Sequence, residues 1–249
     1  MTWDEVRQYH TIVSVGLGQA NADGTLPEPV TQTLATLRRF LDAGGGVLLF
    51  LNFGQMAAEA PPQEAFLKPL GLTPLFAETT SDSDTTVSTA WRVPFAYTDA
   101  IQPGPVTEGV AGLWYPVPAM RIGAQNHTTS FVTEEGWEVI VRGGPTASTH
   151  RRGGLNDNIV DLTAPGTYSG QVPLVATRSV GRGRLLVVGI TAEYLIGAHA
   201  LTTLEGIVLE RGLRDRPSGG YRLLESGLRW LTAPALENAD LGGAQGDPA

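Results

Sequence analysis

The sequence contains no cysteine. This absence excludes disulfide bonds, thiolate metal sites, iron–sulfur clusters and every mechanism that uses a cysteine nucleophile. Lysine is almost absent as well, since Lys68 is the only lysine among the 17 basic residues. The 25 acidic residues give a formal net charge of −8, which disfavours binding to a phosphate backbone. We therefore expect no nucleic-acid partner.

Long apolar runs are also missing. None reaches the length that crosses a bilayer, and the first residues lack the basic and then apolar order of a signal peptide. We expect no membrane span and a soluble protein, cytoplasmic by default. The four histidines, His10, His127, His150 and His199, have none of the spacings that are typical of zinc ligands. The sequence predicts neither a metal site nor a cofactor.

The first fifty residues show the clearest pattern of secondary structure. An apolar strand is predicted at residues 11–17, and a second, buried strand at 47–51. Between them, Val30, Leu34, Leu37 and Leu41 recur at helical spacing, and the glycines at 44–46 end the helix. A strand, a helix and a buried strand in this order predict a βαβ unit in a parallel sheet with both faces covered.

The rest of the chain predicts shorter elements within one domain. Two apolar runs, at 172–178 and 184–190, flank a glycine turn and predict a late β-hairpin at the edge of the sheet. Residues 79–105 and 143–170 have the composition of loops. One domain is predicted over 1–232 and a disordered tail over 233–249. The other predicted elements are helices at 3–8, 63–70, 198–211 and 221–231 and strands at 110–117, 128–133 and 137–141.

Four short segments together carry a resemblance to a known superfamily. They are residues 9–13 (YHTIV), 41–49 (LDAGGGVLL), 105–110 (PVTEGV) and 180–190 (VGRGRLLVVGI). This combination resembles the class I glutamine amidotransferase-like superfamily, with the trehalose-utilisation (ThuA-like) proteins as the nearest comparison. The resemblance implies an α/β, flavodoxin-like three-layer sandwich with a mostly parallel sheet, to which this chain adds the late β-hairpin and long loop insertions.

Catalytic members of that superfamily carry a Cys-His-Glu triad, with the cysteine on a sharp turn after a strand. The turn matches residues 51–55 (LNFGQ), where Asn52 takes the place of the cysteine and Gly54 that of a glycine. At the end of a later strand, Thr191 stands for the histidine and Glu193 matches the glutamate. The resemblance therefore implies a degenerate site with Glu193 as a catalytic remnant, and cysteine-dependent glutaminase activity is excluded.

Polar residues in loops at the carboxyl ends of strands are candidate ligand contacts, because such loops line crevices in α/β sheets. The loop after the first strand begins like a dinucleotide fingerprint, but Asn21 replaces its third glycine. We predict ligand contacts at Gln19, Asn21, Asn52, Gly54 and Glu193. Aromatic rings that suit a sugar are present at Trp91, Trp114 and Trp137, although core packing is the expected role of these side chains.

Three functions remain open from the sequence. The first is a non-catalytic amidotransferase-like domain that binds a small polar ligand, such as a carbohydrate, or a partner chain. The second is a sugar-processing hydrolase or oxidoreductase of ThuA-like type that uses Glu193, Asp161 or a histidine. Here His150 with Asp157 or Asp161 is a candidate acid–base pair.

The third is a structural assembly module. Superfamily members begin with a strand and a helix ahead of the segment that residues 2–17 match, and this sequence lacks them. Met1 is then an internal start, the chain is a fragment, or another segment or subunit supplies that strand. A sheet edge left open in this way would favour a partner chain or a homo-oligomer.

Overall fold

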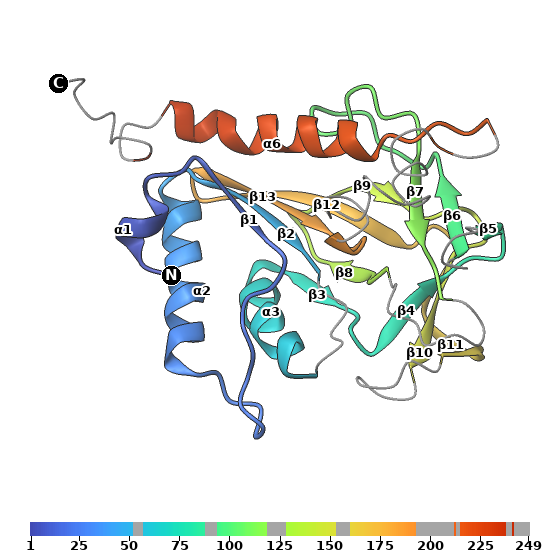
Figure 1. Ribbon diagram of the computed structural model, residues 1–249, viewed down its shortest axis with the longest axis horizontal. Coiled ribbons are helices and arrows are strands. Elements are labelled where there is room, and N and C mark those ends of the chain that lie inside the picture. The colour runs from blue at the N-terminus through green and yellow to red at the C-terminus, as the bar shows by residue number, and fades with distance from the viewer. Residues whose placement is uncertain are drawn as a thin grey trace.

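Figure 1 shows the protein as a computed structural model, which describes residues 1–51, 57–87, 94–118, 128–152, 160–192, 212, 215–237 and 241. Its centre is a five-stranded sheet, here called the central sheet, with the order β1-β2-β13-β12-β9. The strands are β1 (Thr11–Ser14), β2 (Gly46–Phe50), β13 (Gly183–Val188), β12 (Pro173–Val180) and β9 (Glu138–Arg142).

The predicted βαβ unit is confirmed. Strands β1 and β2 pair in parallel, and α2 (Glu28–Asp42) connects them. Gly44 follows the helix with a φ of 102°, a left-handed conformation that glycine adopts without steric cost and that ends the helix. Strand β1 pairs directly with β2, so no strand is missing between these two. Strand β1 lies at one edge of the central sheet.

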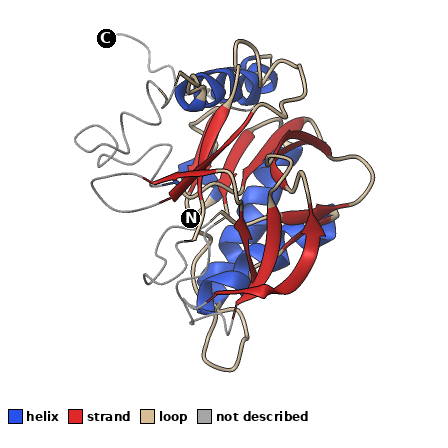
Figure 2. Ribbon diagram, turned by 90° about the vertical axis from the view of Figure 1, so that its right-hand side faces the viewer, coloured by secondary structure: helices blue, strands red, loops and turns tan. Residues whose placement is uncertain are grey.

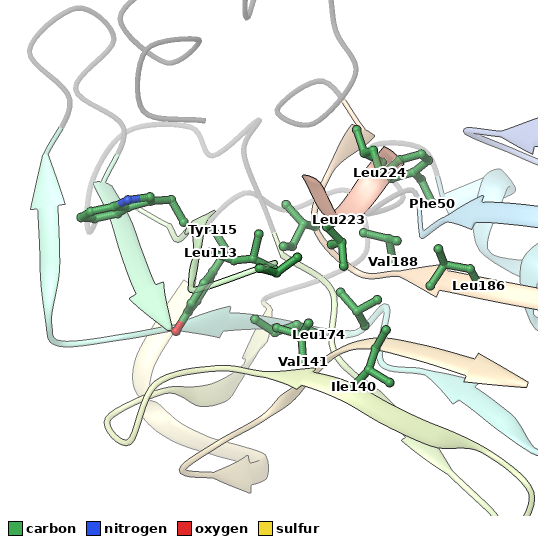
Figure 3. Packing of buried hydrophobic residues seen from close by; sticks show 14 of the residues in the cluster. Phe50, Leu113, Tyr115, Ile140, Val141, Leu174, Leu186, Val188, Leu223 and Leu224 are labelled. Atoms are coloured by element: carbon green, nitrogen blue, oxygen red, sulfur yellow. The ribbon is translucent and has the colours of Figure 1, made fainter. Parts of the chain in front are cut away.

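Helices cover both faces of the central sheet, because alternate residues of its strands point to opposite sides. Leu48 and Phe50 of β2 pack in one cluster with Leu223, Leu224 and Leu231 of α6 (Gly220–Leu236). Figure 1 shows α6 along one face of the sheet, and Figure 3 shows Phe50, Leu223 and Leu224 within this cluster. Val47 and Leu49 pack on the other side with α1 (Trp3–Val6), α2 and α3 (Ala60–Leu67). Each fully buried leucine contributes ~1.5–3 kcal/mol, so burial on two faces holds this sheet in place.

The late hairpin is confirmed, but its place in the sheet differs from the prediction. Strands β12 and β13 pair in antiparallel register around Gly181, whose φ is 58°. Strand β13 also pairs in parallel with β2, so the hairpin enters the interior and β9 forms the far edge. Two of the four pairings are therefore antiparallel, and the central sheet is mixed rather than mostly parallel.

Two regions predicted as loops contain strands. Residues 79–105 include β5 (Thr85–Val87), β6 (Pro94–Thr98) and most of β4 (Glu78–Ser81), and residues 143–170 include all of β10 (Ser148–Arg152) and β11 (Val160–Ser169). Their many Thr and Ser residues suit strands whose hydroxyls meet across neighbouring chains. Composition alone suggested turns, because the same residue types also favour turns.

These strands build smaller sheets at one end of the molecule, and Figure 2 looks onto that end. The sheet β11-β10-β4, here called the outer sheet, is fully antiparallel. Strands β5, β6 and β7 (Leu113–Pro116) form another sheet, and β3 (Leu72–Pro74) pairs with β8 (Phe131–Thr133). Short 3-10 helices occur at Ala57–Glu59 (η1) and Lys68–Leu70 (η2).

The remaining helices agree with the sequence prediction where they are described. Helix α1 begins with a capping box, in which the Thr2 backbone N–H donates to Glu5 Oε2 at 2.6 Å. This hydrogen bond lowers the pKa of the Glu5 carboxyl. Helix α6 continues to Leu236, past the predicted domain end at 232. The predicted helix at 198–211 lies outside the described residues. None of the described helices is long and apolar enough to span a membrane.

Candidate functional site

The carboxyl ends of β2 and β13 lie side by side, as the resemblance requires. The Leu51 backbone N–H donates to the Val188 carbonyl at 2.8 Å, which brings the residue before Asn52 next to the end of β13. Beyond that end, Ile190 forms a bridge with Thr128, and Thr191 is only 6% exposed. Thr191, which the sequence resemblance matches to a catalytic histidine, carries a hydroxyl, and a hydroxyl cannot serve as the general base at neutral pH.

The loop after β1 reaches the same edge of the sheet. The Ala20 backbone N–H donates to the Ala58 carbonyl at 2.7 Å, which ties the loop to η1. Gln19 is exposed beside this contact. Asn21 is also exposed, but its Nδ2 donates to Thr25 Oγ1 at 2.9 Å within its own loop. The backbone therefore brings the Gln19 loop next to η1, which follows β2 in the chain, while the amide of Asn21 stabilises a turn.

Three of the predicted contacts, Asn52, Gly54 and Glu193, lie outside the described residues, as do Trp91, His127, Asp157 and His199. For Asp161 only the backbone is described. Within the described ranges, no three His, Asp or Glu side chains are grouped as a metal site would need.

The described tryptophans are structural. Trp114 is 2% exposed within the core, and its Nε1 has no hydrogen-bond partner. The Trp137 Nε1 donates to the Leu70 carbonyl at 2.6 Å, and the Arg178 guanidinium lies 5.9 Å from the centre of its ring. Trp114 is buried and the partly buried Trp137 packs against the apolar cluster of α2 and α3, so both residues take part in core packing.

The outer sheet carries a polar cluster that the sequence did not predict. We call Ser81, Ser148 and His150 the hydroxyl–imidazole cluster. Ser148 Oγ lies 2.7 Å from His150 Nε2, and His150 Nδ1 lies 3.2 Å from the Ala164 carbonyl oxygen. Ser81 Oγ lies 3.4 Å from Ser148 Oγ. Among the described residues, His150 therefore contacts a serine and a backbone carbonyl, while the side chains of its predicted partners, Asp157 and Asp161, lie outside the described residues.

Strand geometry brings these three side chains together. Ser148 and His150 are two residues apart on β10 and therefore share one face of the sheet. Strand β4 runs antiparallel to β10 with Ser81 opposite Ser148. The alternation Ser-x-His within residues 148–150 was visible in the sequence. The pairing partner of the strand was not visible, because residues 81 and 148 are far apart in the chain.

A second network continues from the cluster into the core. The Tyr115 hydroxyl donates to Asp82 Oδ2 at 2.6 Å and accepts the Gly144 backbone N–H at 3.1 Å, and Thr146 Oγ1 donates to Asp82 Oδ1. Burial, followed by the Asp82 carboxylate, raises the pKa of Tyr115 far above its ordinary value. The phenol therefore stays protonated and acts as a fixed donor that joins β7 to the turn before β10.

Glu78 lies on the opposite face of the outer sheet from His150. Its Oε1 accepts the Thr167 hydroxyl at 2.7 Å and its Oε2 accepts the Thr167 backbone N–H at 3.0 Å. Burial raises the pKa of Glu78, but hydrogen bonds from Thr149 and Thr167, with the charge of Arg151, outweigh it and the net pKa is lowered. Glu78 therefore fastens β11 to β4 and does not orient the imidazole.

Comparison with known proteins relates the fold to solved structures. No protein-family model matches the sequence, and the curated proteins contain no match to it. The N-terminal domain of mmIFT52 aligns with 93% of this chain and 80% of its own, at 12% identity and a TM-score of 0.54. The cytoplasmic protein STM3548 from Salmonella typhimurium aligns with 92% of this chain and 74% of its own, at 12% identity and a TM-score of 0.51.

A putative ThuA-like protein from Bacteroides uniformis also aligns, over 92% of this chain and 72% of its own, at 14% identity and a TM-score of 0.46. The first two likenesses show that this chain shares a mixed α/β fold with solved structures. At 12% identity they show the fold alone.

Proposed function

We propose that this chain is a domain of the glutamine amidotransferase-like type whose central-sheet site is non-catalytic and serves for binding. The observation that carries the proposal is the chemistry of the degenerate triad. The whole sequence lacks cysteine, and in this proposal Thr191, which is buried just beyond the end of β13, takes the place of the catalytic histidine. Without a thiolate or an imidazole, no thioester forms at this edge of the sheet. The scaffold of α2, β2 and β13 that would hold such a site persists.

The ligand we propose is a small polar molecule, such as a carbohydrate, at the carboxyl edge of the central sheet. Support comes from the adjacent ends of β2 and β13 and from the contact of Ala20 with Ala58, which draws the Gln19 loop toward them. Crevices at the carboxyl ends of parallel strands are the usual ligand sites of α/β folds. In this proposal Gln19, Asn52 and Glu193 hydrogen-bond the ligand.

A thermal-shift screen of monosaccharides, disaccharides and small carboxamides tests this proposal. A ligand that binds only the folded state raises the melting temperature as its concentration exceeds the Kd. We expect at least one compound to do so, and Gln19→Ala and Asn52→Ala to remove most of that rise. Gln8→Ala is the matched control, because Gln8 is exposed and precedes β1, at the opposite edge of the sheet. A screen without any shift, or an equal loss in the Gln8→Ala variant, would overturn the proposal.

A second candidate function, self-association through β1, is favoured by the open edge of the central sheet. Among the described strands, β1 pairs only with β2, and Val13 and Val15 are 46% and 53% exposed. Edge strands are usually protected by charged residues, but residues 8–22 contain no Asp, Glu, Lys or Arg. Two copies can pair their β1 strands about a two-fold axis without like-charge repulsion, which makes a second copy the proposed partner.

Sedimentation velocity over a concentration series tests the self-association. We expect a dimer that Val13→Lys and Val15→Lys dissociate, since a lysine at either position places like charges against each other across the two-fold axis. Leu236→Lys is the control, because Leu236 is 68% exposed at the far end of α6. A monomer at every concentration, or equal dissociation by Leu236→Lys, would contradict this candidate.

A further inference from the structure

The hydroxyl–imidazole cluster contains a serine and a histidine in the relation of a nucleophile to its base. A backbone carbonyl only accepts hydrogen bonds, so the contact of Ala164 O with His150 Nδ1 assigns the ring proton to Nδ1. Nε2 is then the acceptor, and the Ser148 hydroxyl donates to it over 2.7 Å. Base and nucleophile are thus within hydrogen-bond reach, and a third group fixes the orientation of the base.

The surroundings of Ser148 suit an approaching electrophile. Ser148 and His150 are both partly exposed, so neither is sealed within the core. Ser148 is flanked across the sheet by Ser81 on β4 and by Ser169 on β11. Because Ser81 Oγ is 3.4 Å from Ser148 Oγ, it lies within reach of an oxygen on a group bonded to Ser148. The carboxylate of Glu78 lies on the other face of the sheet, away from the negative charge that develops on the acyl oxygen during attack.

We infer that Ser148 is a nucleophile, activated by His150, that reacts with small carboxylic esters. Ser148 Oγ forms a bond to the acyl carbon while its proton passes to His150 Nε2. The ester C–O bond breaks, and the leaving alcohol takes that proton from the imidazole. Water then attacks the acyl-serine, gives its proton to Nε2, and the carboxylic acid leaves as Ser148 recovers its proton. This activity is separate from the binding proposed at the central sheet, so the two can fail independently.

Covalent labelling of the full chain with a fluorophosphonate probe, read as intact mass, tests the inference. We expect one adduct per chain, its loss in Ser148→Ala, and a labelling rate at least tenfold lower in His150→Gln. p-Nitrophenyl acetate should show an acylation burst that disappears in the same two variants. Ser179→Ala is the matched control, because Ser179 is an exposed serine on β12 with no imidazole bonded to it in the described structure. It should label like the parent chain.

A second variant keeps the test decisive if Ser148→Ala fails to fold. Ser148→Cys introduces the only thiol in the chain, since the sequence has no cysteine. We expect iodoacetamide to alkylate it faster when His150 is present than when Ser148→Cys is combined with His150→Gln, because the imidazole favours the thiolate. No fluorophosphonate adduct, an adduct on another residue, or equal rates with and without His150 would overturn the inference.

Discussion

In the central sheet, β2 buries all five of its residues and β13 packs Leu185, Leu186, Val187 and Val188 between two layers of helices. In the outer sheet, β4 and β10 instead bring hydroxyl, imidazole and charged side chains to both faces. Apolar burial holds the first sheet, whereas hydrogen bonds between distant segments hold the second. The segments whose secondary structure is easiest to predict from the sequence therefore hold the fewest side chains that could take part in a reaction.

The largest expected effect is on the central sheet. Leu186→Ala removes a buried side chain that lies below α6 and leaves a cavity, which we expect to lower the free energy of unfolding by ~3–4 kcal/mol. Urea unfolding followed by circular dichroism measures this change. Ser81→Ala in the outer sheet, where Ser81 is only partly buried, should cost ~1 kcal/mol or less. Equal losses in the two variants would remove the distinction between the sheets.

Tyr115→Phe should have an intermediate effect, because it removes one hydroxyl from the network that anchors the outer region. The Asp82 carboxylate loses a donor and the Gly144 N–H loses its acceptor, which we expect to cost ~1–3 kcal/mol. Urea unfolding measures the loss. Tyr168→Phe is the control, since no hydrogen bond of the Tyr168 hydroxyl is part of this network. A cost for Tyr115→Phe no greater than for the control would show that burial alone holds β7.

How well the sequence predicts secondary structure also differs between the central sheet and the outer sheet. The 3.6-residue repeat of α2 and the unbroken apolar runs of β2 and β13 predict their elements closely, because each pattern is local. The polar strands β4 and β10 escaped prediction, since Thr and Ser favour turns as well as strands until a pairing partner is known. Ser148 and His150 are neighbours on one strand, but Ser81 joins them only through that pairing, so no local pattern could reveal the whole cluster.

The smallest expected effect concerns acid stability in the outer sheet. The pKa of Glu78 is lowered in the folded protein from its ordinary value of 4.5. Its stabilising contribution is therefore fully present above pH 4.5 and is lost as the pH falls through the lower folded pKa. We expect Glu78→Gln to be less stable than the parent at pH 7, with a difference that shrinks toward pH 3.

Thermal unfolding at the two pH values measures this difference. Glu135→Gln, at an exposed glutamate in the turn before β9, is the control and should change little at either pH. A difference between Glu78→Gln and the parent chain that grows on acidification would contradict the assigned direction of the Glu78 pKa.

The division of the molecule into a non-catalytic central sheet and a reactive outer sheet is tested most directly by locating the fluorophosphonate adduct after trypsin digestion. Cleavage after Arg142 and Arg151 releases residues 143–151, which contain Ser148, while Ser81 and Thr191 lie on other peptides. The account predicts that the adduct is confined to residues 143–151 and is carried by Ser148. An adduct at Thr191 or in the loop after β1, or no adduct on residues 143–151, would contradict it.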